Sequence, residues 1–390
     1  MPVKNRLAEL HAEITAWRRQ IHANPELQYD LPKTTAFVAE QLRSFGVDEV
    51  VEGVGRSGIV GVIRGKTDTS GKCVGLRADM DALPMDEITG VDYASTTPGK
   101  MHACGHDGHT AMLLGAAQYL AETRNFDGTV CLIFQPAEEG GAGGKAMVDD
   151  GMMDRFGIRE VYGMHNEPGL AVGEFGVSPG PIMAAADEFE VTIIGKGGHA
   201  AQPHNCIDPS PATCAVVMAL QTVASRNVDP LKQVVVSVCT IKTSSEAFNV
   251  IPASVLMRGT VRTLDDGVRD LAEERVRALI TATAEAYGCT TDLRYERGYP
   301  VTVNHEANAR IAADIAEAVA GQGRVHYGRP PRMGAEDFSY MLLERPGAFI
   351  NIGNGDTAKV HHPAYNFNDD AIPYGCSFFA ELVERRMPAA

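Results

Sequence analysis

The sequence contains no apolar run of the roughly 18 residues that a helix needs to cross a bilayer. Its first residues alternate charged side chains with leucine and form no apolar core of the kind found in signal peptides. The eight cysteines include no CxxC pair, which argues against a disulfide framework and for reduced thiols. These absences together favour a soluble, cytoplasmic protein.

Positive charge is also in short supply. Lys and Arg number 35 against 50 Asp and Glu, which leaves a formal net charge of −15. The electrostatic field of a protein with this negative charge repels phosphate backbones and anionic lipid, so neither nucleic acid nor a membrane surface is an expected partner. The hydrophobic content of 44% and charged content of 22% are typical of a globular protein. The length of 390 residues predicts two to three domains of about 150 residues each.

Short apolar segments alternate with helical patterns over the first 180 residues. An opening helix is predicted over 7–21, where Leu, Ile and Trp recur at spacings of three and four. Near-continuous apolar strands separated by helices are typical of a sheet that is covered on both faces, so we expect an α/β layer. The patterns predict further helices at 32–45 and 109–122 and strands at 58–63, 72–79, 129–135 and 161–166.

The pattern changes between residues 185 and 299. Strands and helices there follow the order β-α-β-β-α-β, which is the order of a ferredoxin-like unit. The α/β pattern resumes after it, with a helix from 304, a strand at 348–353 and a final helix over 369–386. We therefore expect one domain made of 1–184 and 300–390, interrupted by a second domain of 185–299.

Two short patterns resemble well-known motifs but lack the structural context that those motifs need. Residues 53–58 spell GxGxxG, yet a strand follows them where a dinucleotide motif must open a helix. Residues 176–180 spell GxSxG, but Pro179 has no N–H to form an oxyanion hole. Both segments are expected to be turns.

The densest group of reactive side chains is the segment MHACGHDGH at 101–109. Most of the cysteines, such as Cys131 and Cys239, lie in apolar runs and are expected to be buried as small apolar residues. Cys104 differs, because His106 is two residues away and glycines flank them. A thiolate and an imidazole so placed can converge on one cation from a loop. The alternative is a helix N-terminus that is rich in histidine by chance.

Acidic residues and histidines follow the predicted strands. Glu138 and Glu139 come after 129–135, where one carboxylate can bind a metal and the other act as a general base. The alternative for this pair is an acidic N-terminus of the next helix. His165 closes the strand at 161–166, and His361 and His362 follow the strand at 348–353. These residues share the carboxyl edge of one sheet, where α/β proteins place their sites.

Two aspartates after the strand at 72–79 complete this edge. Asp81 is the candidate for a carboxylate that holds a ligand imidazole in one tautomer. Asp79 is either a second such group or a surface aspartate.

Eight motifs then occur in the order found in a known family. The chain resembles the hippurate hydrolase branch of the aminoacylase/carboxypeptidase metallopeptidases, and the resemblance covers nearly its whole length. The motifs are ADMDALP (78–84), MHACGHDGH (101–109), PAEEG (136–140), GMHN (163–166), GGHAAQPH (197–204), FNVIP (248–252), GAEDF (334–338) and HHPAYNFND (361–369).

The resemblance implies a zinc-peptidase-like catalytic domain with a mixed sheet between helices, interrupted by a ferredoxin-like lid domain that also dimerises. It implies Glu138 as the general base, His199 as an oxyanion-stabilising residue and Asn249 as a substrate-binding residue. His361 is preferred over His362 because this branch aligns the first histidine. It further implies two metal ions with the ligands Cys104, His106, Glu139, His165 and His361. The thiolate, imidazole and carboxylate donors of these residues suit divalent Zn, Mn, Co or Ni.

The function expected from these features is a metal-dependent amidohydrolase that cleaves N-acyl amino acids such as hippurate or N-acetyl amino acids. A dipeptidase or carbamoyl-amino-acid hydrolase on the same scaffold is the alternative within enzymes, and a non-catalytic metal-binding protein is the alternative outside them. We also expect a homodimer formed through the lid domain, in which His199 reaches the metal ions of the partner.

Overall fold

The computed structural model describes residues 3–389 and divides into two compact units. The first unit contains the chain up to Gly180, Val303–Pro330 and the chain from Asp337 on. The second unit contains Pro181–Thr302 and Pro331–Glu336. The domain predicted over 185–299 lies inside the longer segment of the second unit. Met1, Pro2 and Ala390, which the prediction places in the first domain, lie outside the described residues.

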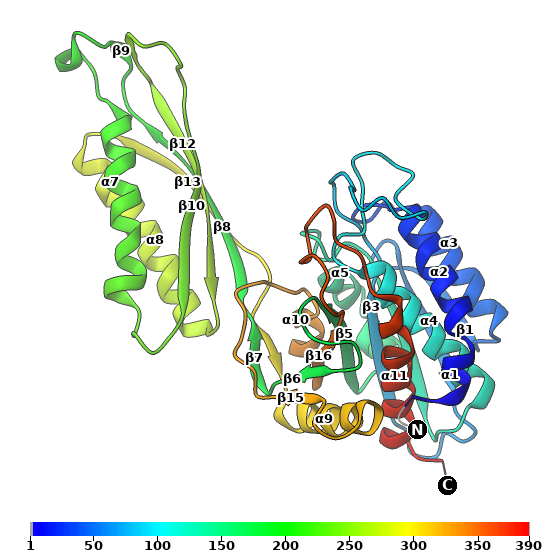
Figure 1. The fold of residues 1–390 in the computed structure, drawn as a ribbon. Helices are drawn as coiled ribbons and strands as arrows, with labels where there is room; N and C mark the ends of the chain where they lie inside the picture. Colours follow the sequence, from blue (N-terminus) through cyan, green and yellow to red (C-terminus); the bar gives the residue numbers. More distant parts are fainter. Residues whose placement is uncertain (1–2, 390) are drawn as a thin grey trace. The chain divides into compact units, whose positions relative to one another are not determined.

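The first unit is built on an eight-stranded mixed sheet, as the fold prediction requires (Figure 1). In the order β1-β2-β4-β3-β5-β16-β6-β15, the four central strands β4, β3, β5 and β16 run parallel to one another. Their carboxyl ends therefore share one edge. The strands are β1 (Glu49–Val54), β2 (Gly58–Arg64), β3 (Cys73–Asp79), β4 (Thr129–Gln135), β5 (Glu160–Glu167), β6 (Phe175–Val177), β15 (Val325–Tyr327) and β16 (Gly347–Gly353).

Helices cover both faces of this sheet, which explains why β2, β3 and β4 are buried along almost their whole length. The main hydrophobic core lies between the sheet and α1 (Asn5–Glu9), α2 (His11–Ala23), α3 (Pro32–Ser44), α4 (His106–Thr123), α9 (Glu306–Ala320) and α11 (Ile372–Arg386). The other face carries α5 (Gly143–Asp149), α6 (Met152–Arg155) and α10 (Ser339–Glu344). No helix within residues 3–389 is long and apolar enough to span a membrane.

The opening helix differs from its prediction, because the segment predicted as one helix over 7–21 forms two. α1 ends at Glu9 and α2 begins at His11, with Leu10 between them at φ −77° and ψ −5°. The residues that carry the periodicity, from Leu7 to Ile21, are nevertheless buried. The spacing of the apolar residues therefore predicted the buried face correctly, but it did not predict the break between the two helices.

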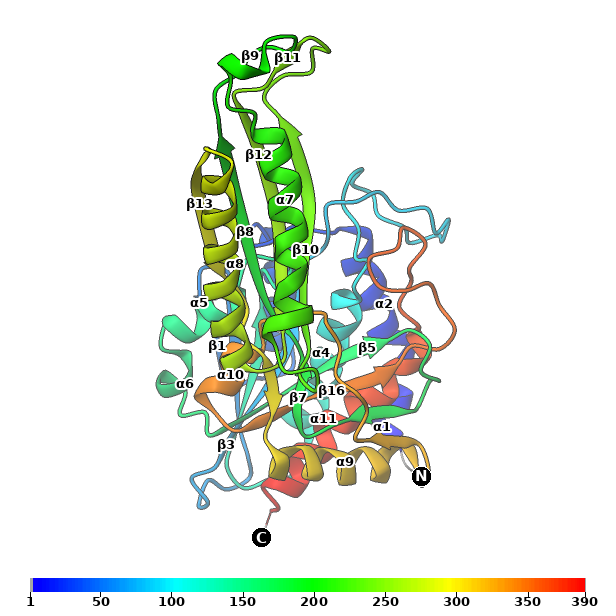
Figure 2. The ribbon, with the colours of Figure 1, turned by 90° about the vertical axis from the view of Figure 1, so that its left-hand side faces the viewer.

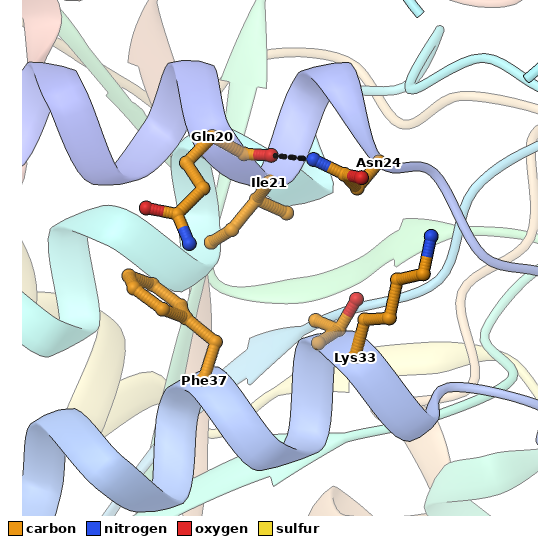
Figure 3. A pocket seen from close by; sticks show the side chains of 6 residues that line it. Gln20, Ile21, Asn24, Lys33 and Phe37 are labelled. Atoms are coloured by element: carbon orange, nitrogen blue, oxygen red, sulfur yellow. Dashed lines mark hydrogen bonds between the residues drawn. The ribbon is translucent and has the colours of Figure 1, made fainter. Parts of the chain in front are cut away.

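A small pocket lies between α2 and α3 (Figure 3). Asn24 Nδ2 donates a hydrogen bond of 3.0 Å to the carbonyl of Gln20 at its rim. None of the predicted site residues lines this pocket. Its lining residues are Gln20, Ile21, Asn24, Lys33, Thr34 and Phe37.

The second unit is a four-stranded antiparallel sheet with two helices packed on one face (Figure 2). The strand order β10-β12-β8-β13 and the element order are those of a β-α-β-β-α-β unit. Its elements are β8 (Ala185–Ile194), α7 (Pro209–Thr222), the π-helical turn Val223–Asn227, β10 (Val234–Thr243), β12 (Ser254–Thr263), α8 (Asp266–Ala286) and β13 (Thr290–Arg297).

Shorter elements complete the chain. β9 (Gly198–His199) pairs with β11 (Val250–Ile251) at one end of the second unit (Figure 2). Two further short strands, β7 (Gly180–Met183) and β14 (Thr302–Asn304), lie where the chain passes from one unit to the other. Three-residue 3₁₀ turns form at Pro203–Asn205 and Asp369–Ala371.

The cysteine prediction holds for Cys131 but is wrong for Cys239. Cys131 is fully buried in β4, whereas Cys239 is an exposed free thiol in β10. β10 is an edge strand, and its register with β12 shifts between Val238 and Thr240. Val236 and Val238 of this strand pack against the core of the second unit, so strand alternation turns Cys239 to the opposite, exposed face.

The two segments that resemble GxGxxG and GxSxG motifs form turns between strands, as predicted. Residues 53–58 run through the hairpin between β1 and β2, and Ser178 lies between β6 and β7.

Candidate metal centre

The segment that carries Cys104 and His106 is a tight turn at the start of α4. Gly105 is the residue before the helix and has a φ of +97°, which side-chain-bearing residues rarely adopt. A Cβ atom at this position would lie 2.2 Å from Nδ2 of Asn166. Glycine is therefore required on both conformational and steric grounds, and it holds Cys104 and His106 against the end of β5.

Two histidines are fixed in the tautomer that offers Nε2 as a ligand atom. Nδ1 of His106 lies 2.8 Å from the carbonyl oxygen of Asp81, and Nδ1 of His165 lies 2.7 Å from that of Asn166. Each Nδ1 is thereby the protonated donor, which leaves the lone pair on Nε2. Nε2 of His106 is buried and has no hydrogen-bond partner among the described residues, while Nε2 of His165 lies 3.3 Å from Sγ of Cys104.

The adjacent glutamates are held by Asp81 through the backbone. Ala137 turns the chain after β4 with a φ of +52°, and the N–H groups of Glu138 and Glu139 then donate to the two carboxylate oxygens of Asp81 at 2.9 and 3.1 Å. The sequence predicted that the Asp81 carboxylate would hold an imidazole. In the structure the backbone carbonyl of Asp81 accepts from Nδ1 of His106, and Oδ1 of its carboxylate lies 3.4 Å from the same nitrogen while both carboxylate oxygens also shape the glutamate turn.

His361 approaches the same cluster from the segment after β16. Its N–H donates a 2.7 Å hydrogen bond to the carbonyl of Ala103, and its φ is +65°. Nε2 of His361 lies 3.2 Å from Oε1 of Glu139. His362 instead accepts a hydrogen bond from the N–H of Ala364, and only His361 of the pair belongs to a group of potential ligand atoms among the described residues.

The potential ligand atoms form overlapping groups in which all members lie within 4.8 Å of one another. One group joins Cys104, His106 and His165, and a second joins Cys104, Glu139 and His361. Cys104 belongs to both, so its sulfur lies within 4.8 Å of the other ligand atoms in each group, and the two groups together offer donors for divalent metal ions. Thiolate, imidazole and carboxylate together suit zinc and its first-row neighbours.

The protonation states of the cluster also fit a cation. Burial raises the pKa of the Cys104 thiol well above its usual range, so the thiolate needs a compensating positive charge. Burial lowers the pKa of His165, which keeps that imidazole neutral. Burial opposes protonation of His106, but the Asp79 carboxylate raises its pKa well above its usual range. Without metal the His106 imidazole therefore holds a proton on Nε2, and a bound cation would displace that proton.

The sequence analysis identified neither His109 nor Arg77 as a site residue. It left two possibilities for Asp79, a group that holds an imidazole or a surface aspartate. All three are buried, so Asp79 is not a surface aspartate. Nδ1 of His109 lies 2.6 Å from Oδ1 of Asp79, and Nε2 of His109 accepts from the N–H of Asn166 at 3.0 Å. Since both nitrogens are engaged, His109 supports the site rather than binding metal. The charged residues within the otherwise apolar strand KCVGLRAD were the signal that could have found this group.

His199 and Asn249 lie together in the second unit. His199 pairs with Val250 between β9 and β11, and the N–H of Ala200 donates to the carbonyl of Asn249 at 3.0 Å. Both residues are exposed. Nδ1 of His199 accepts from the N–H of Ala201 at 3.1 Å, which leaves Nε2 as the nitrogen available to a ligand.

Comparison with known proteins adds to this geometry. The family model of peptidase family M20/M25/M40 matches residues 75–385. The chain belongs to this family. The M20 assignment confirms the resemblance seen in the sequence, and it makes the protein a metal-dependent hydrolase of amide bonds.

Three known proteins illustrate the similarity. Hippurate hydrolase from Campylobacter jejuni is 39% identical over 376 residues, covering 96% of this chain and 97% of that protein. N-acetyl-L-cysteine deacetylase from Bacillus subtilis is 40% identical over 381 residues, covering 97% and 89%. The crystal structure of the Bacillus subtilis YXEP protein, described as a dinuclear metal binding peptidase, matches with a TM-score of 0.83 and 33% identity, covering 97% and 99%.

Proposed function

We propose that this M20 family member removes the acyl group from small N-acyl amino acids, such as hippurate or N-acetyl amino acids. The observation that carries the proposal is the convergence of Cys104, His106, Glu139, His165 and His361, with one further carboxylate, Glu138, beside them. A structural metal site is closed by its protein ligands, whereas this one has the additional carboxylate of Glu138 beside the ligands. The names of the two curated relatives support an N-acyl amino acid as the substrate.

In this proposal the five residues hold two divalent ions, and Glu138 is the general base. Bound divalent ions polarise the amide carbonyl and make water acidic enough to be deprotonated near neutral pH. Glu138 takes a proton from the attacking water and then passes it to the leaving amine nitrogen. His106, Glu138 and Glu139 have ligand atoms within 4.8 Å of one another, which suits a base beside the ligands.

The second unit is proposed to act as lid and dimerisation domain. β10 and β13 are the edges of its sheet, and only β10 presents apolar groups such as Ile241 and Cys239 at exposed positions. β13 carries several charged side chains, which protect an edge from pairing. Pairing of β10 with its twin in a two-fold dimer would cover this edge. His199 and Asn249 of one subunit would then serve the site of the partner.

A substrate panel tests the proposed activity. Hippurate, N-acetyl-cysteine, an N-carbamoyl amino acid and an unblocked dipeptide are compared by kcat/KM on the metal-loaded enzyme. We expect the two N-acyl amino acids to exceed the carbamoyl compound and the dipeptide by at least about tenfold, which corresponds to about 1.4 kcal/mol in transition-state binding. A preference for the dipeptide or the carbamoyl compound would assign the alternative activities. Absence of hydrolysis across the panel would favour a metal-binding protein without this activity.

A further inference from the structure

Arg77 is a fully buried arginine in β3, within the parallel part of the mixed sheet, and a charged residue is rarely found in such a position without a dedicated partner. It lies in β3 on the strand face opposite to Leu76 and Ala78, two residues before the end of the strand. Its guanidinium donates to three side chains, namely Oδ2 of Asp79 at 2.7 Å, Oε1 of Gln135 at 2.9 Å and Oδ1 of Asp337 at 3.1 Å. A planar fork with several donors is the chemical feature that lysine could not supply here.

The bond to Asp79 leads directly toward the metal centre. One carboxylate oxygen of Asp79 accepts from Arg77, and the other accepts from Nδ1 of His109 at 2.6 Å. Because each oxygen has its own donor, the carboxylate can neither rotate nor tilt without losing one of them. Burial opposes the charged form of Asp79, but His106, Arg77 and His109 hold its pKa well below the usual range.

Beyond His109 the chain of hydrogen bonds reaches Asn166, which contacts the segments that carry the proposed ligands. The N–H of Asn166 donates to Nε2 of His109 at 3.0 Å. Asn166 directly follows the proposed ligand His165 in the sequence. Nδ2 of Asn166 donates to the carbonyl of Cys104 at 2.6 Å, and its Oδ1 accepts from the hydroxyl of Tyr365 at 2.8 Å. A shift of His109 would therefore disturb both ligand segments.

Asp337 anchors the other side of the guanidinium. Its Oδ1 also accepts from Nε2 of Gln135 at 2.7 Å, and its Oδ2 accepts from the N–H of Gly144 at 2.8 Å. Asp337 is fully buried and is the first residue of the first unit after Pro331–Glu336. Arg77 thus links Asp337, where the chain returns to the first unit, with Asp79, which holds His109 beside the proposed metal ligands.

We propose that Arg77, together with Asp337, is a positioning residue of the metal centre, which acts through Asp79, His109 and Asn166 on the segments of Cys104 and His165. The inference rests on the proposed metal centre, because it concerns how tightly that centre binds its ions. Groups that orient metal ligands typically change metal affinity about 10–100-fold when they are removed.

The test measures Zn²⁺ affinity of the full-length protein by competition with a chromophoric chelator, starting from metal-free enzyme. Arg77→Met is compared with Arg269→Met, because Arg269 is another buried arginine, paired with Asp187 at 2.5 Å in the second unit. Both substitutions are expected to lower the melting temperature of the metal-free protein. Only Arg77→Met is expected to weaken Zn²⁺ binding, by about 10–100-fold, while Arg269→Met stays within about threefold of wild type.

Asp337→Asn serves where Arg77→Met does not fold, since asparagine keeps the size of the side chain and removes its charge. We expect it to weaken Zn²⁺ binding by about tenfold. Folded Arg77→Met or Asp337→Asn protein that binds Zn²⁺ as tightly as wild type would overturn the positioning role alone. Wild-type protein that binds no Zn²⁺ would overturn the proposed metal centre and this inference with it.

Discussion

Replacing Glu138 with glutamine is expected to lower kcat for hippurate or N-acetyl-cysteine by about 10²–10⁴-fold, the range typical of a lost general acid–base group. Glutamine matches glutamate in size but cannot accept a proton from water or return it to the amine. The backbone N–H of residue 138, which donates to Asp81, is unchanged by the substitution. Bound metal should stay close to the wild-type amount, as measured by elemental analysis of the purified variant.

Glu139→Gln is the matched control, because it makes the same chemical change one residue later. Glu139 lies in the group with Cys104 and His361, so its loss should lower the metal content as well as the rate. Two results would count against these roles. One is near-wild-type turnover by Glu138→Gln. The other is loss of metal from Glu138→Gln combined with full metal retention by Glu139→Gln, which would exchange the two assignments.

His199→Ala is expected to lower kcat by about 10²–10³-fold, the usual cost of removing one oxyanion-stabilising donor. His199 is exposed in the β9–β11 pair, and within the described residues its ring accepts one hydrogen bond, from the N–H of Ala201. Its removal should therefore leave both metal content and melting temperature near those of wild type. His204→Ala, which alters another exposed histidine of the same loop, is the matched control and should retain full activity.

Mixing two inactive variants tests whether His199 serves the partner subunit. A dimer of His199→Ala with Glu138→Gln holds one site with both wild-type groups if the histidine comes from the other chain. Random exchange would then restore about a quarter of wild-type activity, since half of the dimers are mixed and each has one complete site. Absence of recovery despite demonstrated subunit exchange would show that His199 does not act in trans.

The pattern of strands and helices was predictable where the elements are long. The pattern of apolar residues gave β2, β3 and β4 almost residue by residue, because a strand that is buried on both faces leaves a short, continuous apolar run in the sequence. The three-residue strands β6 and β15 were not predicted, since so short a segment carries no period. Pro331–Glu336 shows no pattern that would assign it to the second unit.

The position of the site in the fold was also predictable, because residues that follow parallel strands meet at the carboxyl edge of the sheet. Glu138, His165 and His361 follow or end β4, β5 and β16, and the structure brings their side chains to one cluster with Cys104 and His106. Which of His361 and His362 faces the cluster depends on a backbone with positive φ, and only the family resemblance chose between them.

The supporting groups could not be derived from the sequence. Arg77 and Asp337 are 260 residues apart, and only the assembled sheet shows that they share a hydrogen bond. The role of Asp81 depends on how the backbone places its carbonyl and its carboxylate relative to His106 and the glutamate turn. Charged residues within an apolar strand nevertheless signal a buried polar network, because an unpaired buried charge is too costly to retain.

A metal titration of the metal-free wild-type enzyme tests the central claim most directly. Zn²⁺, Mn²⁺, Co²⁺ or Ni²⁺ is added stepwise, and bound ions per chain and the rate of hippurate or N-acetyl-cysteine hydrolysis are measured on the same samples. We predict that the metal-free protein is inactive and that the rate reaches its plateau at two bound ions per chain. A metal-free protein that hydrolyses these amides at the full rate would contradict the account.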